Sequence, residues 1–135
     1  MGKKQILIVD DEPHMRIFMA TLFETSGYKP VLARNGNEGI EKARKYIPDL
    51  IILDVMMPGG GGVQMYRELK TDDALRRVPV IMLSAVDGET FSHSLKMFHV
   101  TENGALPEPD AYVEKLPEAD VLLGVAQSLL SDSGN

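Results

Sequence analysis

The sequence predicts an open α/β fold, in which helices cover both faces of a parallel sheet. Four short apolar runs lack the period-two alternation of half-exposed strands, so each is expected to be buried on both sides. They are Ile6 to Val9, Leu50 to Leu53, Val78 to Leu83 and Ala111 to Val113. A fifth run, Val31 to Ala33, follows Pro30, whose missing N–H places it at a sheet edge. The alternation of strands with helical segments implies right-handed crossovers.

Five helices are expected from apolar residues at helical spacing. Pro13 fits the first turn of the first helix and Gly27 its end. The apolar positions are Met15, Phe18, Met19, Leu22 and Phe23; Ile40, Ala43 and Ile47, ending before Pro48; Met65 and Leu69; Phe91, Leu95 and Phe98; and Leu122, Val125, Ala126 and Leu129. Gly59 to Gly62 and Asn103 to Asp110 are predicted to be loops because of their Gly and Pro content.

Length and composition fit one compact domain. The chain has 135 residues, of which 44% are hydrophobic and 25% charged, as in ordinary globular proteins. We assign residues 1–131 to the domain and residues 132–135 to a polar tail or the start of a linker. No apolar run approaches the roughly 20 residues that cross a bilayer, and no secretory leader is recognisable, so a cytoplasmic location is expected.

Charge and cysteine content exclude several functions. The net charge of -6 would repel nucleic-acid phosphates, so direct nucleic-acid binding is not expected. The chain has no cysteine, which excludes disulfides, thiolate metal sites and cysteine nucleophiles. Any metal must therefore be held by oxygen or histidine ligands.

Polar residues follow the predicted strands at the edge where open α/β sheets bind ligands. They are Asp10, Asp11 and Glu12 after the first strand, Asp54 after the third, Ser84 after the fourth, and Tyr112 and Lys115 in and after the fifth. Carboxylates about 5 Å apart would repel by roughly 3 kcal/mol per pair at an effective dielectric constant near 20, which favours a bound cation. Oxygen ligands suit Mg²⁺, which commonly bridges to phosphate.

Each of these residues also has an ordinary structural explanation when it is considered alone. An aspartate after a strand commonly caps the next helix, Ser84 fits a turn, and Lys115 fits a solvated charge. Tyr112 equally fits a half-buried strand aromatic. His14 follows the acids, but it lies in a first helical turn where polar residues are common. The joint placement of acids, a hydroxyl and a lysine on successive strand ends is what predicts a phosphoryl site.

Four motifs make the chain resemble the receiver domains of two-component response regulators. They are Ile6 to Glu12 (ILIVDDE), Leu53 to Gly62 (LDVMMPGGGG), Val78 to Ala85 (VPVIMLSA) and Tyr112 to Lys115 (YVEK). The resemblance implies a flavodoxin-like, doubly wound sheet of five parallel strands in the order 2-1-3-4-5, with five helices. This order agrees with the edge position derived from Pro30.

The resemblance implies that Asp54 accepts a phosphoryl group from a sensor histidine kinase or a phosphotransfer protein. Asp11, Asp54 and the backbone carbonyl of Met56 would bind Mg²⁺ directly, and Asp10 would act through metal-bound water. Such a protein catalyses only its own phosphorylation and dephosphorylation, so it is not an enzyme toward other substrates.

The resemblance further implies that Ser84 and Lys115 hold phosphoryl oxygens in a loose transition state. Ser84 would move toward the phosphate together with a rotamer change of Tyr112, altering the face formed by the fourth helix, fifth strand and fifth helix. That face would contact an output protein, an output domain beyond this sequence, or a second copy in a homodimer. These residues do not identify the kinase or the output protein.

Two features depart from the family pattern. Leu116 separates Lys115 from Pro117, whereas the family usually joins the lysine directly to a cis-proline. Ser84 and Lys115 are 31 positions apart, with the surplus in residues 103–110, which form either a partner-specific surface or a tolerated excursion. These features leave open a pseudoreceiver that binds partners without phosphorylation. A haloacid-dehalogenase-like phosphatase is disfavoured, because Met56 stands where that family has its second aspartate.

Overall fold

The computed structural model describes residues 2–55, 57, 61–84, 107, 109–114 and 119–133. Strands and helices alternate from β1 to β4, and β5 is followed by a helix, as predicted. In chain order they are β1 (Gln5–Val9), α1 (Pro13–Thr25), β2 (Lys29–Ala33), α2 (Gly36–Tyr46), β3 (Leu50–Asp54), α3 (Gly61–Thr71), β4 (Val80–Ser84), β5 (Ala111–Glu114) and α5 (Ala119–Ser133). The predicted fourth helix, around Phe91 to Phe98, lies outside the described residues.

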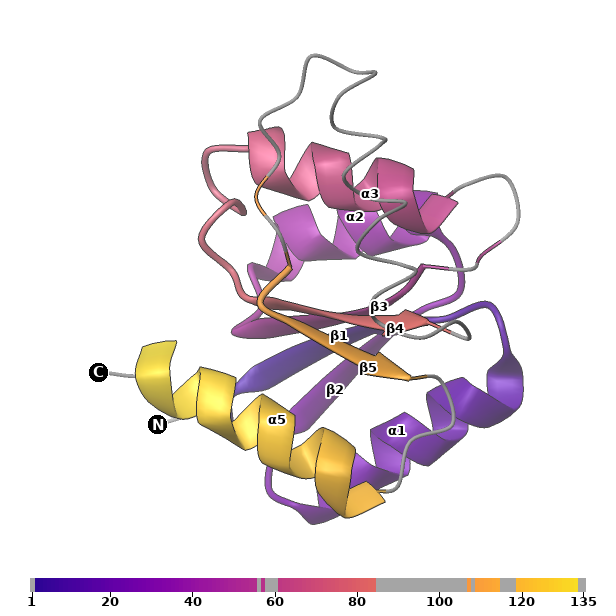
Figure 1. Ribbon diagram of the computed structural model, residues 1–135, viewed down its shortest axis with the longest axis vertical. Coiled ribbons are helices and arrows are strands. Elements are labelled where there is room, and N and C mark those ends of the chain that lie inside the picture. The colour runs from indigo at the N-terminus through magenta and orange to yellow at the C-terminus, as the bar shows by residue number, and fades with distance from the viewer. Residues whose placement is uncertain are drawn as a thin grey trace.

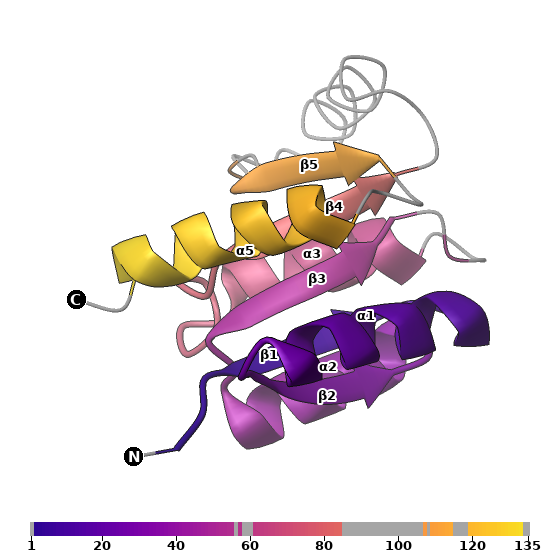
Figure 2. The same ribbon diagram turned by 90° about the horizontal axis from the view of Figure 1, so that it is seen from below.

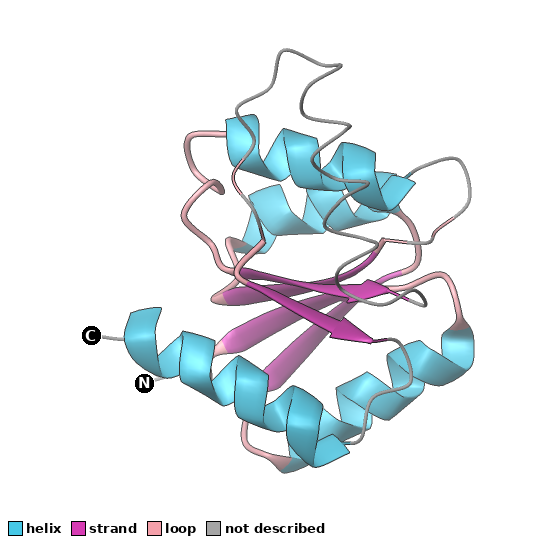
Figure 3. Ribbon diagram, viewed as in Figure 1, coloured by secondary structure: helices cyan, strands magenta, loops and turns pink. Residues whose placement is uncertain are grey.

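The five strands form one parallel sheet in the order β2-β1-β3-β4-β5, which confirms the predicted topology. The strand that contains Pro30 lies at the sheet edge, as its missing N–H requires. Helices α2 and α3 cover one face and α1 and α5 the other, so the sheet is the middle of three layers (Figures 1 and 3). Seen from below, α1 and α5 lie in front of the sheet (Figure 2).

Strand residues alternate between two apolar clusters, one on each face of the sheet. In β3, Ile51 and Leu53 pack with α2 and α3, whereas Leu50 and Ile52 pack with α1 and α5. All four are fully buried, which explains why these runs show no polar alternation. Asp54 continues the series of Leu50 and Ile52 and therefore belongs to the α1 and α5 face.

Helix α1 begins with Pro13 at its first position and buries Met15, Met19 and Phe23. Gly27 follows its end with a φ of 97°, a conformation that favours glycine. Phe18 was predicted on the buried face but is 36% exposed. That prediction was wrong because the buried residues of α1 follow a spacing of four, Met15, Met19 and Phe23. Phe18 therefore lies at the edge of the buried face.

Helix α2 is capped by Asn35, whose side chain accepts from the Glu38 N–H at 2.8 Å. Ile47 was predicted on its buried face, but it lies beyond the helix in a left-handed conformation (φ 44°) and is 46% exposed. The following Pro48 disfavours helical geometry at this residue, so the chain leaves the helix there.

Several element boundaries differ from the prediction. Helix α3 begins at Gly61, so Gly61 and Gly62 are helical rather than part of the glycine loop. Strand β2 begins at Lys29 instead of Val31, and strand β4 begins at Val80 instead of Val78. Helix α5 ends at Ser133. Among the helices of the described residues, none combines the length and apolar character needed to cross a membrane.

Candidate functional site

Four acids meet at the carboxyl ends of β1 and β3. Oxygen atoms of Asp10, Asp11, Glu12 and Asp54 all lie within 4.8 Å of one another. Asp10 and Asp54 are fully buried, whereas Asp11 and Glu12 are exposed. The two strands are neighbours in register, which explains why acids 42 positions apart in the chain converge. The four acids that the sequence places at this edge do lie together.

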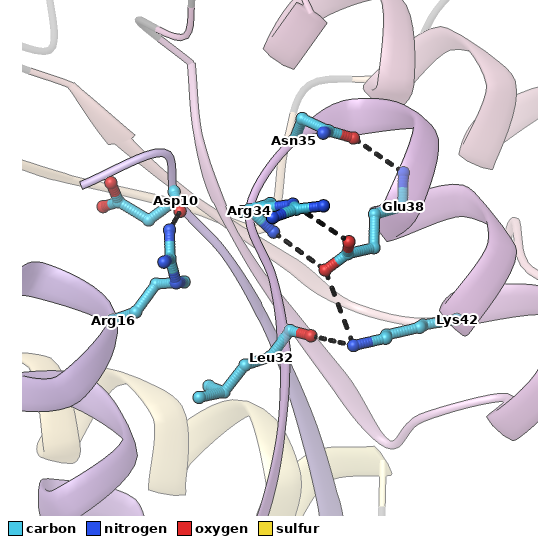
Figure 4. A network of polar contacts seen from close by, with 7 residues as sticks. All are labelled: Asp10, Arg16, Leu32, Arg34, Asn35, Glu38 and Lys42. Carbon is cyan, nitrogen blue, oxygen red and sulfur yellow. Dashed lines mark hydrogen bonds and ion pairs between the residues drawn. The ribbon is translucent and has the colours of Figure 1, made fainter. Parts of the chain in front are cut away.

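Hydrogen bonds hold the turn between β1 and α1. The Asp10 N–H donates to the Ala33 carbonyl at 3.1 Å, and the Glu12 N–H donates to Asp10 Oδ1 at 2.8 Å. From the first turns of α1, Arg16 Nη1 donates to the Asp10 carbonyl at 2.6 Å (Figure 4). The Asp10 carboxylate is thus partly engaged by the turn itself.

The chemistry of the donor set fits a hard divalent cation. All four groups are carboxylates, and two of them are removed from water, where mutual repulsion is least screened. A divalent cation offsets that repulsion, and oxygen-only ligation is the preference of Mg²⁺ and Ca²⁺. His14 is exposed in α1 and is not part of this cluster.

Helix α3 packs its backbone directly behind the end of β3. A Cβ atom placed on Gly62 would lie 2.6 Å from the Asp54 carbonyl oxygen and 2.6 Å from Val55 Cα. A Cβ on Gly36, at the start of α2, would lie 2.9 Å from the Gly61 carbonyl oxygen. Gly62 thus allows the start of α3 to approach the end of β3, and Gly36 allows the start of α2 to approach the start of α3, more closely than any other residue would permit.

The remaining predicted site residues are placed only in part. Ser84 is the last residue of β4, beside β3, so its backbone lies at the acidic edge. The side chain of Ser84, together with Met56 and Lys115, lies outside what the structure describes. Tyr112 is a half-buried strand residue that pairs with Met82 and packs against the α2 and α3 cluster. It therefore lies two positions before the residue of β5 that pairs with Ser84.

Pro107 and Asp110, which precede β5, are hydrogen-bonded to α3 and β4. The Tyr66 hydroxyl of α3 donates to the Pro107 carbonyl at 2.6 Å. Asp110 and Val80 exchange two hydrogen bonds, of 3.1 Å through the Asp110 N–H and 2.9 Å through its carboxylate. Lys70 lies 5.6 Å from the Tyr66 ring centroid. Burial lowers the pKa of Lys70, and the charge of Asp110 acts in the opposite direction.

Sequence reasoning missed three residues of this region. Gly62 belongs to the family motif Leu53 to Gly62, but it was predicted in a loop and its contact with the Asp54 backbone was not expected. Arg16 and Tyr66 were not singled out. Their helical periodicity shows which side of a helix they occupy, but it carries no signal of the distant backbone carbonyls that they contact.

Comparisons with known proteins agree with this geometry. The family model described as "Response regulator receiver domain" matches residues 6–102. The chain belongs to the response regulator receiver domain family. It is 40% identical over 85 residues to the polar-differentiation response regulator DivK of Brucella anthropi, covering 63% of this chain and 68% of that protein. It is 38% identical over 82 residues to the phosphate regulon transcriptional regulatory protein PhoB of Escherichia coli, covering 61% of this chain but 36% of that protein.

Solved structures resemble this receiver domain over most of its length. A signal receiver domain of a signal transduction histidine kinase from Syntrophus aciditrophicus has a TM-score of 0.79 and 32% identity, covering 96% of this chain and 91% of that one. The chemotaxis response regulator CheY4 of Vibrio cholerae has a TM-score of 0.80 and covers 95% and 99%, but its 23% identity supports the fold alone. The protein is a receiver domain of a two-component system, and its family implies a phosphoprotein.

Proposed function

We propose that this receiver domain is a phosphorylation switch whose phosphoacceptor is Asp54. The observation that carries the proposal is the convergence of four carboxylates within 4.8 Å at the ends of β1 and β3. Asp54, the last residue of the central strand β3, is fully buried. Family membership supports the same role, because receiver domains interact with histidine kinases or phosphotransfer proteins. A sensor kinase or a phosphotransfer protein is therefore the proposed donor.

The cation proposed for this site is Mg²⁺, held by Asp11, Asp54 and the Met56 backbone carbonyl. Asp10 would assist through water, which agrees with the engagement of its Oδ1 by the Glu12 N–H. When bound, the ion neutralises charge on the carboxylates and on the phosphoryl oxygens. The alternative of a bare acidic site is disfavoured because two of the four carboxylates are buried.

In the proposed reaction an Asp54 carboxylate oxygen attacks the phosphorus atom of the donor. The new oxygen–phosphorus bond forms as the bond between phosphorus and the donor nitrogen breaks, and the donor imidazole keeps its electron pair. Ser84 and Lys115 would bind the phosphoryl oxygens, so that catalysis consists mainly of positioning and charge neutralisation. Water would later hydrolyse the acyl phosphate, so the protein acts only on its own phosphorylation state.

The proposed output is a change of the surface around β5 and α5. Tyr112 lies in the middle of β5 and packs toward α3, two positions from the residue that pairs with Ser84. A displacement of Ser84 toward the phosphate would therefore be passed to a strand that borders this surface. A downstream protein, a further domain or a second copy would bind there.

Acetyl phosphate with Mg²⁺ tests the proposal without a cognate kinase. Intact-mass spectrometry should detect one phosphoryl adduct on the wild type and none on Asp54→Asn. Asp49→Asn is the matched control, because Asp49 lies just before the opposite end of the same strand and is exposed, and it should retain the adduct. Because Asp54 is fully buried, the labelling reaction is followed over time and not at one early point.

The outcomes separate the competing functions. A wild type that binds Mg²⁺ but never forms the adduct would point to a pseudoreceiver and contradict the proposal. An adduct that persists in Asp54→Asn would place the phosphoacceptor elsewhere. Rapid turnover of a phosphorylated small molecule with release of free phosphate, well beyond one phosphoryl group per chain, would instead favour a phosphatase.

A further inference from the structure

Arg16 contacts both ends of the turn that carries three of the four acids. It is half-buried in α1, one helical turn after Glu12. Its side-chain Nη1 donates to the Asp10 carbonyl at 2.6 Å, and its backbone N–H donates to the Glu12 carbonyl at 3.1 Å. The Glu12 N–H in turn donates to Asp10 Oδ1 at 2.8 Å. Arg16, which lies outside the turn, therefore hydrogen-bonds to both its first and its last acidic residue.

The Asp10 carbonyl lies where the ladder between β1 and β2 stops. The Asp10 N–H still donates to Ala33, but Ala33 is the last residue of β2, and Asn35 already caps α2. A buried backbone carbonyl needs a donor, so a side chain must replace the ladder at this point. Arginine suits the position because it stays protonated and carries several N–H donors.

The direction of this contact separates Arg16 from the ligand set. Figure 4 shows the Arg16 guanidinium at the backbone carbonyl of Asp10, while the Asp10 carboxylate points away from it. The guanidinium thus secures the main chain without occupying the carboxylate oxygens. A ligand that is oriented by its main chain keeps those oxygens available at the edge of the sheet.

We propose that Arg16 is a positioning residue for cation binding, which holds the Asp10 and Asp11 carboxylates within reach of Asp54. The inference rests on the proposed function, because it concerns the same site. Its sign is informative: a guanidinium acting only through its charge would repel Mg²⁺, so its removal would tighten binding. A guanidinium acting through orientation has the opposite effect, and its removal weakens binding.

The test measures Mg²⁺ affinity of the full chain directly, by titration with Mg²⁺ alone followed by backbone amide chemical shifts. Arg16→Met keeps an apolar stem but loses the donor and the charge, and it should weaken Mg²⁺ binding by about tenfold. Arg16→Lys restores a charged donor and should recover part of that loss. The matched control is Arg34→Met, which removes an arginine that pairs with Glu38 at 3.4 Å at the neighbouring strand end and whose side chain is 72% exposed.

A second readout distinguishes positioning from general destabilisation. In acetyl phosphate labelling, Arg16→Met should require more Mg²⁺ for half-maximal rate, while its rate at saturating Mg²⁺ should stay near that of the wild type. Mg²⁺ binding by Arg16→Met that is unchanged, tighter, or weakened only as much as in Arg34→Met would overturn the inference. If Arg16→Met does not fold, Arg16→Lys decides, and wild-type affinity in that variant would overturn it.

The failure of this inference is distinguishable from that of the proposed function. If the wild type neither binds Mg²⁺ nor forms the adduct, the proposed function fails and the role of Arg16 fails with it. If the wild type does both and the Arg16 variants match it, only the role of Arg16 is lost.

Discussion

The two faces of the sheet contribute to the site in different ways. The face covered by α1 and α5 supplies carboxylates, because Asp54 continues the strand positions that point toward it and α1 begins directly after Glu12. The face covered by α2 and α3 supplies close backbone packing, with Gly62 against the end of β3. One face carries the acidic cluster and the other packs against the end of β3, so changes on the two faces should be separable by stability and cation-binding measurements.

The largest effect is expected from Gly62→Ala on the α3 face. The added methyl would meet backbone atoms of Asp54 and Val55 at 2.6 Å, and neither can move like a side chain. We expect the free energy of unfolding to fall by about 3 kcal/mol, measured by urea denaturation. Gly124→Ala is the control in α5, where nothing lies within 4 Å of the added atom. It should raise stability by about 0.5 to 1 kcal/mol, and equal losses in both variants would contradict the argument.

Mg²⁺ should stabilise the protein through the acidic face. If the cation binds the folded state alone, a concentration one hundred times its Kd raises the free energy of unfolding by about 2.7 kcal/mol. The measurement is a urea titration with and without Mg²⁺ at constant ionic strength. Asp54→Asn should show a smaller increase, and Gly124→Ala should show the full increase. An equal response in Asp54→Asn would remove Asp54 from the ligand set.

Tyr66→Phe should weaken the anchor between α3 and the segment before β5. The variant loses the hydroxyl that donates to the Pro107 carbonyl at 2.6 Å, at a cost of about 1 kcal/mol in the free energy of unfolding. Amide hydrogen exchange should rise first at Asp110, whose N–H bonds to Val80 beside this contact. Tyr46→Phe, on a residue that is 40% exposed, should leave both measurements close to wild type. Unchanged exchange at Asp110 would show that the anchor is not needed there.

The smallest effect is expected from Asp72, at the outer edge of the α2 and α3 layer. The Ala74 N–H and Arg44 hold the pKa of Asp72 below its usual value of 3.8. A folded-state pKa that is depressed gives stability above the unfolded value, and this stability is lost as the pH falls through the folded value. The stability difference between wild type and Asp72→Asn should therefore be present at pH 7 and shrink below pH 3.8.

Asp73→Asn removes the same charge from the next residue, which is exposed, and serves as the control. The two variants have the same net charge, so a difference between them reports on the contacts of Asp72. A difference for Asp72→Asn that grows as the pH falls would have the wrong sign and would contradict the assignment. Urea denaturation at several pH values measures both variants in the same way.

Sequence patterns identified the strands of the central sheet and the acids at its edge for a clear physical reason. Strands buried on both faces are continuous apolar runs, and in a parallel sheet their carboxyl ends meet at one edge. Asp10, Asp11, Glu12 and Asp54 needed no further information to be placed together. Helix faces were less well determined, since Phe18 and Ile47 have apolar side chains that the tertiary structure leaves partly exposed.

The amino-acid sequence by itself determined the layer order, the edge strand and the identity of the acidic cluster. These depend on periodicity, on the missing N–H of Pro30 and on strand ends, all of which are local. Only the tertiary structure decided that Gly62 packs against the Asp54 backbone, that Arg16 completes the end of the β1 ladder, and that Tyr66 anchors Pro107. Each of these is a contact to a backbone atom. Because backbone atoms have the same chemistry in every residue, no sequence pattern predicts such a contact.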